Sequence, residues 1–236
     1  MIIEKESPLR HLPADLDPKQ ATFLDGIRYA IEMADLAYSR LTQSLHVFAT
    51  EYARGSETTV NDRLWASSFL DAWSIVDSVH RLRGLLAQLP QLKKSSPPYQ
   101  VFERKTRDVE EMRNIVQHLN RELRHFAQNN LPVFGTIDWL TVINTDLGIV
   151  RSSVIVAGRA MSGTHQLCNP LGKRVAIPVD HITLTCKSRT VDVSGTISSI
   201  TSIVSMIETS LRALPSETPN RWLGCISRDG NQMRRF

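Results

Sequence analysis

Arg113, Asn114 and His118 are the residues of this chain whose types and spacing best suit chemistry on a phosphate. An imidazole exchanges protons near neutral pH, and a guanidinium can form two parallel hydrogen bonds to a phosphate. In a helix, Asn114 and His118 lie one turn apart on the same side, and Arg113 lies beside them with a long reach. The three side chains could therefore serve one site that binds a phosphate and transfers a proton.

The surrounding stretch, residues 107–126, has two faces if it is helical. Its apolar side chains recur every three or four positions and form one stripe: Met112, Val116, Leu119, Leu123 and Phe126. Its polar side chains fall within about 60° of one line on the opposite side: Arg107, Glu110, Glu111, Asn114, His118, Arg121 and His125. We expect Arg107, Arg121 and His125, which share this face, to bind the same substrate.

A metal site is the alternative interpretation of these charged side chains. Glu122 and His125 have the Glu-x-x-His spacing that di-iron bundles use. Asp77 and His80 have the same spacing on another helix but match the motif poorly, because aspartate replaces glutamate. Glu122 and His125 lie beside the polar stripe, however, and not on the apolar face that would line a bundle core. We expect no metal and no cofactor, and stoichiometric iron or manganese in purified protein would favour the alternative.

Four helices are predicted to position these residues. Apolar residues at helical spacing indicate helices over about 18–54, 59–89, 101–129 and 194–214. Asp17 before Pro18 is typical of a helix start, because the carboxylate accepts hydrogen bonds from free N–H groups of the first turn. The third of these helices carries Arg113, Asn114 and His118.

Residues 136–193 are predicted to form a small antiparallel β insertion of about four strands. Segments rich in β-branched residues indicate strands at 137–143, 149–157 and 175–179, and residues 158–174 are predicted to form a loop. Residues 181–186 alternate, with Ile182, Leu184 and Cys186 on one side, and are expected to pair with residues 190–193.

The composition favours a globular protein. Of the 236 residues, 42% are hydrophobic and 22% charged, and the net charge is +4, which permits a nucleic-acid partner without requiring one. The three Cys residues are far apart, which argues against a disulfide framework. We expect no signal peptide, no membrane association and a cytoplasmic location, because no long apolar run occurs.

These elements predict a mostly α fold, an antiparallel four-helix bundle with the β insertion between its third and fourth helices. Residues 1–16 are expected to form an extended arm, residues 17–214 the bundle with its insertion, and residues 215–236 a flexible basic tail. The arginines of that tail could contact phosphates: Arg221, Arg228, Arg234 and Arg235.

The sextet Arg113-Asn114-x-x-x-His118 on a third helix resembles the HEPN superfamily of four-helix bundles. The resemblance covers about 190 residues in the order of elements but only six in the motif. It implies metal-independent RNA cleavage by a homodimer, with a toxin or defence role and an antitoxin or other protein partner. His118 would then move a proton at the ribose hydroxyl or the leaving oxygen, Arg113 would hold the scissile phosphate, and Asn114 would orient the site.

Two functions stay open on these observations. The first is an endoribonuclease, with Arg113, Asn114 and His118 as catalytic residues. The second is a non-catalytic interaction or regulatory module that uses the same polar face. Arginines followed by histidines also occur at Arg40/His46 and Arg159/His165, so only Asn114 and the position on the third helix single out Arg113.

Overall fold

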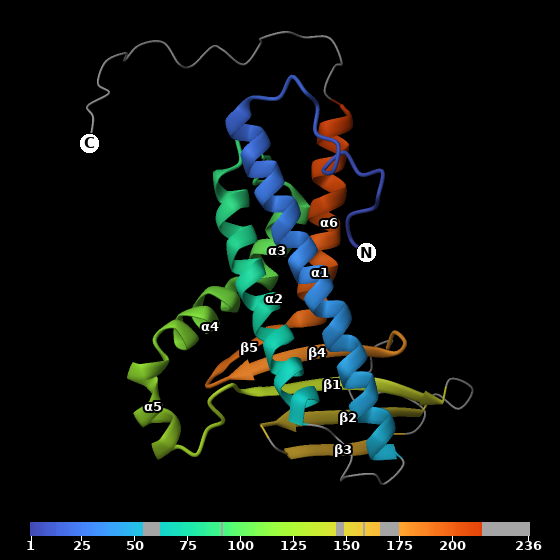
Figure 1. Ribbon diagram of the computed structural model, residues 1–236, viewed down its shortest axis with the longest axis vertical. Coiled ribbons are helices and arrows are strands. Elements are labelled where there is room, and N and C mark those ends of the chain that lie inside the picture. The colour runs from blue at the N-terminus through green and yellow to red at the C-terminus, as the bar shows by residue number, and fades with distance from the viewer. Residues whose placement is uncertain (54–61, 91, 145–148, 158, 166–174, 214–236) are drawn as a thin grey trace.

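The computed structural model describes residues 1–53, 62–90, 92–144, 149–157, 159–165 and 175–213. Its described part is mostly helical and contains one antiparallel sheet, which lies beneath one end of the long helices (Figure 1). Residues 214–236, which include the predicted basic tail, lie outside the described part. None of the described helices is long and apolar enough to cross a membrane.

Three long helices form the bundle: α1 (Pro18–Ala53), α2 (Asp62–Gln88) and α6 (Val193–Arg212). The predicted start of α1 is confirmed, because Asp17 Oδ1 accepts hydrogen bonds from the backbone N–H of Lys19 and Gln20 at 2.9 and 3.1 Å. The predicted start of α2, near residue 59, lies outside the described residues. Asp192 caps α6 by accepting a hydrogen bond of 2.7 Å from Gly195 N.

The prediction of one continuous third helix is wrong. Three short helices occupy this stretch: α3 (Pro97–Lys105), α4 (Arg107–Gln117) and α5 (Leu119–Gln128). The breaks fall at Thr106 and His118, which share a φ of −105°. At the first break, the Thr106 hydroxyl donates 2.7 Å to Phe102 O and accepts a hydrogen bond from Arg83 of α2.

The break at His118 lets α4 and α5 pack against different parts of the molecule. Val109 and Met112 of α4 are buried, and so is Phe126 of α5, but Leu123 is 45% exposed. The predicted apolar stripe therefore does not continue along a single buried face. Figure 1 shows α4 and α5 leaving the bundle at an angle, so the expected four-helix bundle is not formed.

The sheet has five strands: β1 (Thr136–Asn144), β2 (Ile149–Val156), β3 (Arg159–His165), β4 (Val179–Cys186) and β5 (Arg189–Asp192). Their spatial order is β3-β2-β1-β4-β5, and all neighbours are antiparallel. Residues 159–165, predicted as loop, form β3. Of the strand predicted at 175–179, only Val179 belongs to a strand. The predicted pairing of β4 with β5 is confirmed, with Leu184 opposite Val191.

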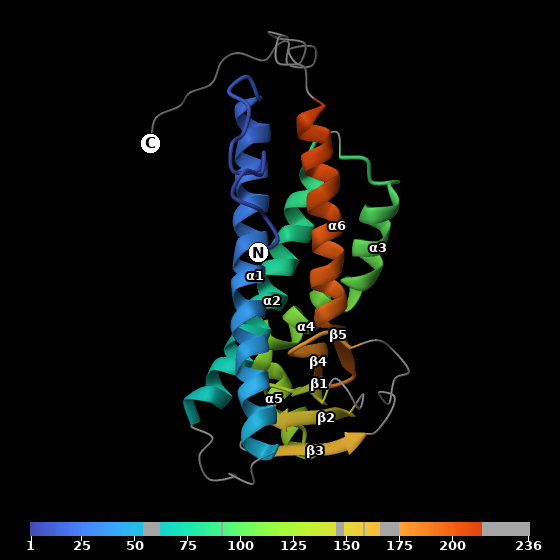
Figure 2. The same cartoon turned by 90° about the vertical axis from the view of Figure 1, so that its right-hand side faces the viewer.

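The sheet shares one hydrophobic core with the helices. Ile137, Ile182 and Leu184 are fully buried in the same cluster as Leu41 and Leu45 of α1. Figure 2 shows the strands lying beside the lower part of α1 and below the end of α6. The sheet is therefore larger than the predicted insertion and supports the bundle, because its inner face supplies part of the common core.

Residues 1–17 form no helix or strand, yet they are not a free arm. Ile3 and Leu9 are each only 1% exposed. Arg10 forms an ion pair of 2.8 Å with Glu32 of α1, and the Ser7 hydroxyl donates to Glu208 of α6. The segment therefore covers α1 and α6 and belongs to the folded body.

Candidate functional site

The predicted site residues lie on an arm that α4 and α5 form beside the sheet (Figure 1). Asn114 and His118 are brought together as predicted: the His118 N–H donates 3.0 Å to Asn114 O in the last turn of α4. Both side chains are exposed. His118 also begins α5, because its carbonyl accepts from the Arg121 N–H at 2.8 Å. The candidate proton-transfer residue therefore lies at a helix junction open to solvent.

Arg113 is engaged on another element. Its Nε donates to Asp77 Oδ1 of α2 at 3.3 Å, and Arg81 Nε donates to Asp77 Oδ2 at 2.8 Å. Partial burial raises the pKa of Asp77, but the hydrogen bonds from Arg81 and Arg113 outweigh it and hold that pKa below its usual range. Arg113 thus fastens α4 to α2 through one of its nitrogens. No hydrogen bond from its terminal nitrogens occurs within the described residues.

His80 lies near this ion pair. Burial lowers its pKa, and the nearby Arg113 and Arg83 guanidinium groups lower it further against the opposing effect of Glu110 and Asp77. His80 is half-buried, and its surroundings favour the neutral imidazole.

Acidic side chains of the arm are directed toward the sheet. Glu111 and Asp108 of α4 form ion pairs with Arg189 of β5, at 2.5 and 3.6 Å. Glu122 of α5 pairs with Lys187 in the β4–β5 turn at 2.5 Å. The hydrogen bond from Lys187 lowers the pKa of Glu122, with smaller contributions from His125 and His118. Three of the four acids of 107–128 are therefore paired with basic residues of β5 and of the β4–β5 turn.

Several basic side chains of the arm are exposed. Arg107, Arg121 and Arg124 are exposed and form no ion pair with any residue that the structure describes. His125 is exposed as well, with Nδ1 3.4 Å from Asn129 Nδ2. The three residues predicted to bind substrate, Arg107, Arg121 and His125, are thus all accessible. Arg124, which the sequence did not single out, joins them.

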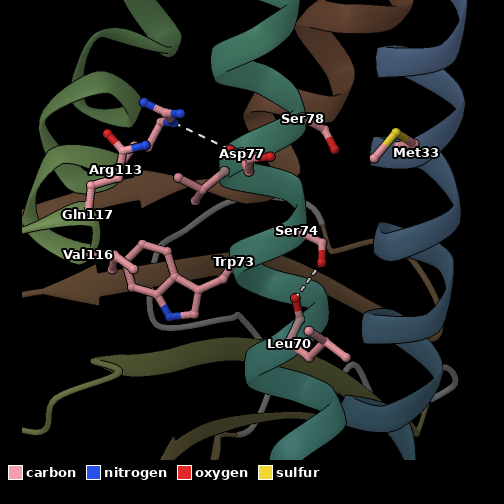
Figure 3. Close-up of a pocket in the computed structure, with 10 residues that line it drawn as sticks. Met33, Leu70, Trp73, Ser74, Asp77, Ser78, Arg113, Val116 and Gln117 are labelled. Atoms are coloured by element: carbon pink, nitrogen blue, oxygen red, sulfur yellow. Dashed lines mark hydrogen bonds and ion pairs between the residues drawn. The ribbon is translucent and has the colours of Figure 1, made fainter. Parts of the chain in front are cut away.

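A cavity of about 320 Å³ lies between α1, α2 and α4 (Figure 3). Its lining is mostly apolar and includes Met33, Leu70, Trp73, Ser74, Val76, Asp77, Ser78, Arg113, Val116 and Gln117. Trp73 is half-buried here, and its Nε1 donates 3.2 Å to Phe134 O. Sequence reasoning missed the cavity, because its walls come from three helices that only tertiary packing brings together.

The alternative metal site finds no support in the positions of its residues. No group of three His, Cys, Asp or Glu side chains that could hold a metal ion occurs in the ranges that the structure describes. Glu122 is paired with Lys187, and Asp77 is held by Arg81 and Arg113.

Comparison of the chain with protein-family models, with curated proteins and with solved structures found no match. Functional inference therefore rests on the geometry of the arm and of the cavity.

Proposed function

We propose that the protein binds single-stranded RNA through the outer face of α4 and α5. The observation that carries the proposal is which charges of this arm are paired and which are not. Lys187 and Arg189 attract the acids to the sheet side, and Arg107, Arg121 and Arg124 are left exposed without ion pairs among the described residues. Unpaired guanidinium groups on one face bind phosphate oxygens and release counterions.

Other side chains on the arm suit RNA in particular. Asn114 and Asn120 are exposed and can form hydrogen bonds with base edges or ribose hydroxyls. Phe134, just beyond α5, is 49% exposed, and an exposed aromatic ring is a surface on which an unpaired base can stack. These features favour a single strand over a duplex, because bases of a duplex are stacked and paired already.

Replacing Arg121 and Arg124 together with glutamine is expected to weaken binding of a fluorescent oligouridylate by about tenfold or more at moderate salt. Each lost phosphate contact should also lower the slope of log affinity against log salt by about 0.7. Fluorescence anisotropy over a salt series measures both quantities.

A double variant with the same charge change provides the control. Arg28→Gln with Arg212→Gln removes two arginines from α1 and α6, where they form exposed ion pairs with Asp25 and Glu208. This control should retain nearly wild-type affinity. Equal losses in the two double variants would show that net charge alone drives binding and would refute the assignment to α4 and α5.

RNA cleavage by a dimer, with His118 as the proton-transfer residue, is the second candidate function. It is favoured by the exposed position of His118, one turn beyond Asn114. Arg113 would have to reach the phosphate with its terminal nitrogens while its Nε holds Asp77. We rank it second, because the ion pair directs Arg113 toward α2, whereas binding alone needs only the exposed face.

His118→Ala is expected to abolish any RNA cleavage while leaving the fold and RNA affinity nearly unchanged, since the side chain is exposed. Gel analysis of a labelled RNA after incubation with wild type and variant tests this, with circular dichroism as the folding control. If wild type leaves the RNA intact, or if the variant cuts equally well, the protein binds RNA without cleaving it at this residue.

A further inference from the structure

The cavity between α1, α2 and α4 lies where α4 faces α2, with Arg113 and Val116 among its lining residues. We infer that it takes a small amphipathic anion, with an apolar body and one carboxylate. Its volume of about 320 Å³ lies at the lower end of the range for small-molecule sites. The inference does not depend on the proposed function, because RNA would bind exposed residues of α4 and α5 that do not line this cavity.

The residues that line the cavity form an apolar surface with a polar end. Met33 of α1, Leu70 and Trp73 of α2, and Val116 of α4 contribute the apolar surface. Met33 is 50% exposed and Leu70 61% exposed, so this surface is open to a ligand. Figure 3 shows Trp73 extending beneath α4 toward Val116, with Met33 facing α2 from the other side. An alkyl or aryl group placed here would cover apolar side chains that now meet water.

Arg113 provides the group that recognises the charge. Asp77 and Arg113 are the only ionisable side chains that line the cavity within the described residues. Asp77 is shared with Arg81, which is the closer partner at 2.8 Å against 3.3 Å for Arg113 Nε. Two guanidinium groups thus face one carboxylate, and the terminal nitrogens of Arg113 remain to donate. A ligand carboxylate would balance this charge, and a guanidinium can bind it with two hydrogen bonds.

Ser78 is an independent sign of a missing partner. It lines the cavity and is 1% exposed, yet its hydroxyl has no hydrogen-bond partner among the described residues. Ser68 and Ser74 on the same helix donate to carbonyls one turn earlier, at 2.8 and 2.7 Å. Figure 3 shows the Ser78 hydroxyl directed toward Met33, on the far side of the cavity from Arg113. A buried hydroxyl without a partner is uncommon, and this one lies at the end of the cavity away from Arg113.

The test uses sodium octanoate and the full chain, with isothermal titration calorimetry and tryptophan fluorescence as readouts. Wild type should bind one octanoate per chain, and this binding should change the fluorescence of Trp73. Arg113→Gln should weaken octanoate at least tenfold, whereas the exposed Arg121→Gln should bind it as wild type does. Octan-1-ol lacks the charge, so it should bind wild type more weakly than octanoate does. Its affinities for wild type and for Arg113→Gln should be equal.

A second variant separates loss of the site from loss of the fold. Ser74→Phe places a ring in the cavity at a half-buried position and should abolish octanoate binding while leaving the circular dichroism spectrum and the RNA affinity unchanged. The inference would be overturned if octanoate failed to saturate wild type. It would also be overturned if octanoate bound Arg113→Gln, or a folded Ser74→Phe, as tightly as it binds wild type.

Discussion

Replacing Trp139 with alanine is expected to lower the free energy of unfolding by about 3–5 kcal/mol, the cost of truncating a large buried aromatic residue. Trp139 lies in the middle of β1 and is 2% exposed. Its ring centroid is 6.4 Å from that of Phe48 on α1, so it lies where the sheet meets the bundle. The substitution would leave a cavity at this junction and remove the hydrogen bond of 3.0 Å from Nε1 to Thr141 Oγ1.

Urea unfolding followed by circular dichroism measures this loss, with Trp73→Ala as the matched comparison. Trp73 is half-buried at the ligand cavity, so its truncation should cost about 1–2 kcal/mol. A Trp139→Ala variant no less stable than Trp73→Ala would mean that sheet and helices do not share a core.

Gly135→Ala is expected to destabilise the protein by about 2–5 kcal/mol, from backbone strain together with overpacking. Gly135 has a φ of +81°, in the left-handed region, and it is buried immediately before β1. An added Cβ would collide with the carbonyl oxygen of Thr185 in β4 and approach Cys186 Cα at 3.3 Å. Both neighbours are backbone atoms of a paired strand, so they cannot move aside without disturbing the β1–β4 ladder.

Gly84→Ala provides the control in the same unfolding experiment. Gly84 lies on the exposed side of α2, and nothing lies within 4 Å of the position of an added Cβ. Alanine should stabilise the helix there by roughly 0.5–1 kcal/mol. A mild effect at Gly135, comparable in size to that at Gly84, would show that the approach of β1 to β4 is looser than the contact with Thr185 requires.

Much of the secondary structure could be predicted because it depends on local pattern. The apolar periods of α1 and α6 and the Asp17 cap involve residues within one or two turns of each other. The alternation of Ile182, Leu184 and Cys186 likewise identified the buried side of β4, and all three are fully buried. β3 was missed because Arg159–His165 has little apolar content, and its pairing with β2 defines it as a strand.

The candidate site was only partly predictable. Asn114 and His118 lie together because one helical turn joins them, which the sequence specifies. Whether Arg113 joins them depends on Asp77, 36 positions earlier. Which acids of the arm are paired depends on Lys187 and Arg189, more than 60 positions later. The dimer expected from the resemblance stays a prediction.

The sequence by itself determined which segments are helical, where α1 begins, and that Arg113, Asn114 and His118 lie close in one stretch. Only the tertiary structure decided that this stretch bends at His118, that three acids of the arm pair with Lys187 and Arg189, and that α1, α2 and α4 line a cavity. The physical reason is the range of the interactions. Helix periods and caps act within a few residues, whereas the ion pairs and the shared core join groups that lie far apart along the chain.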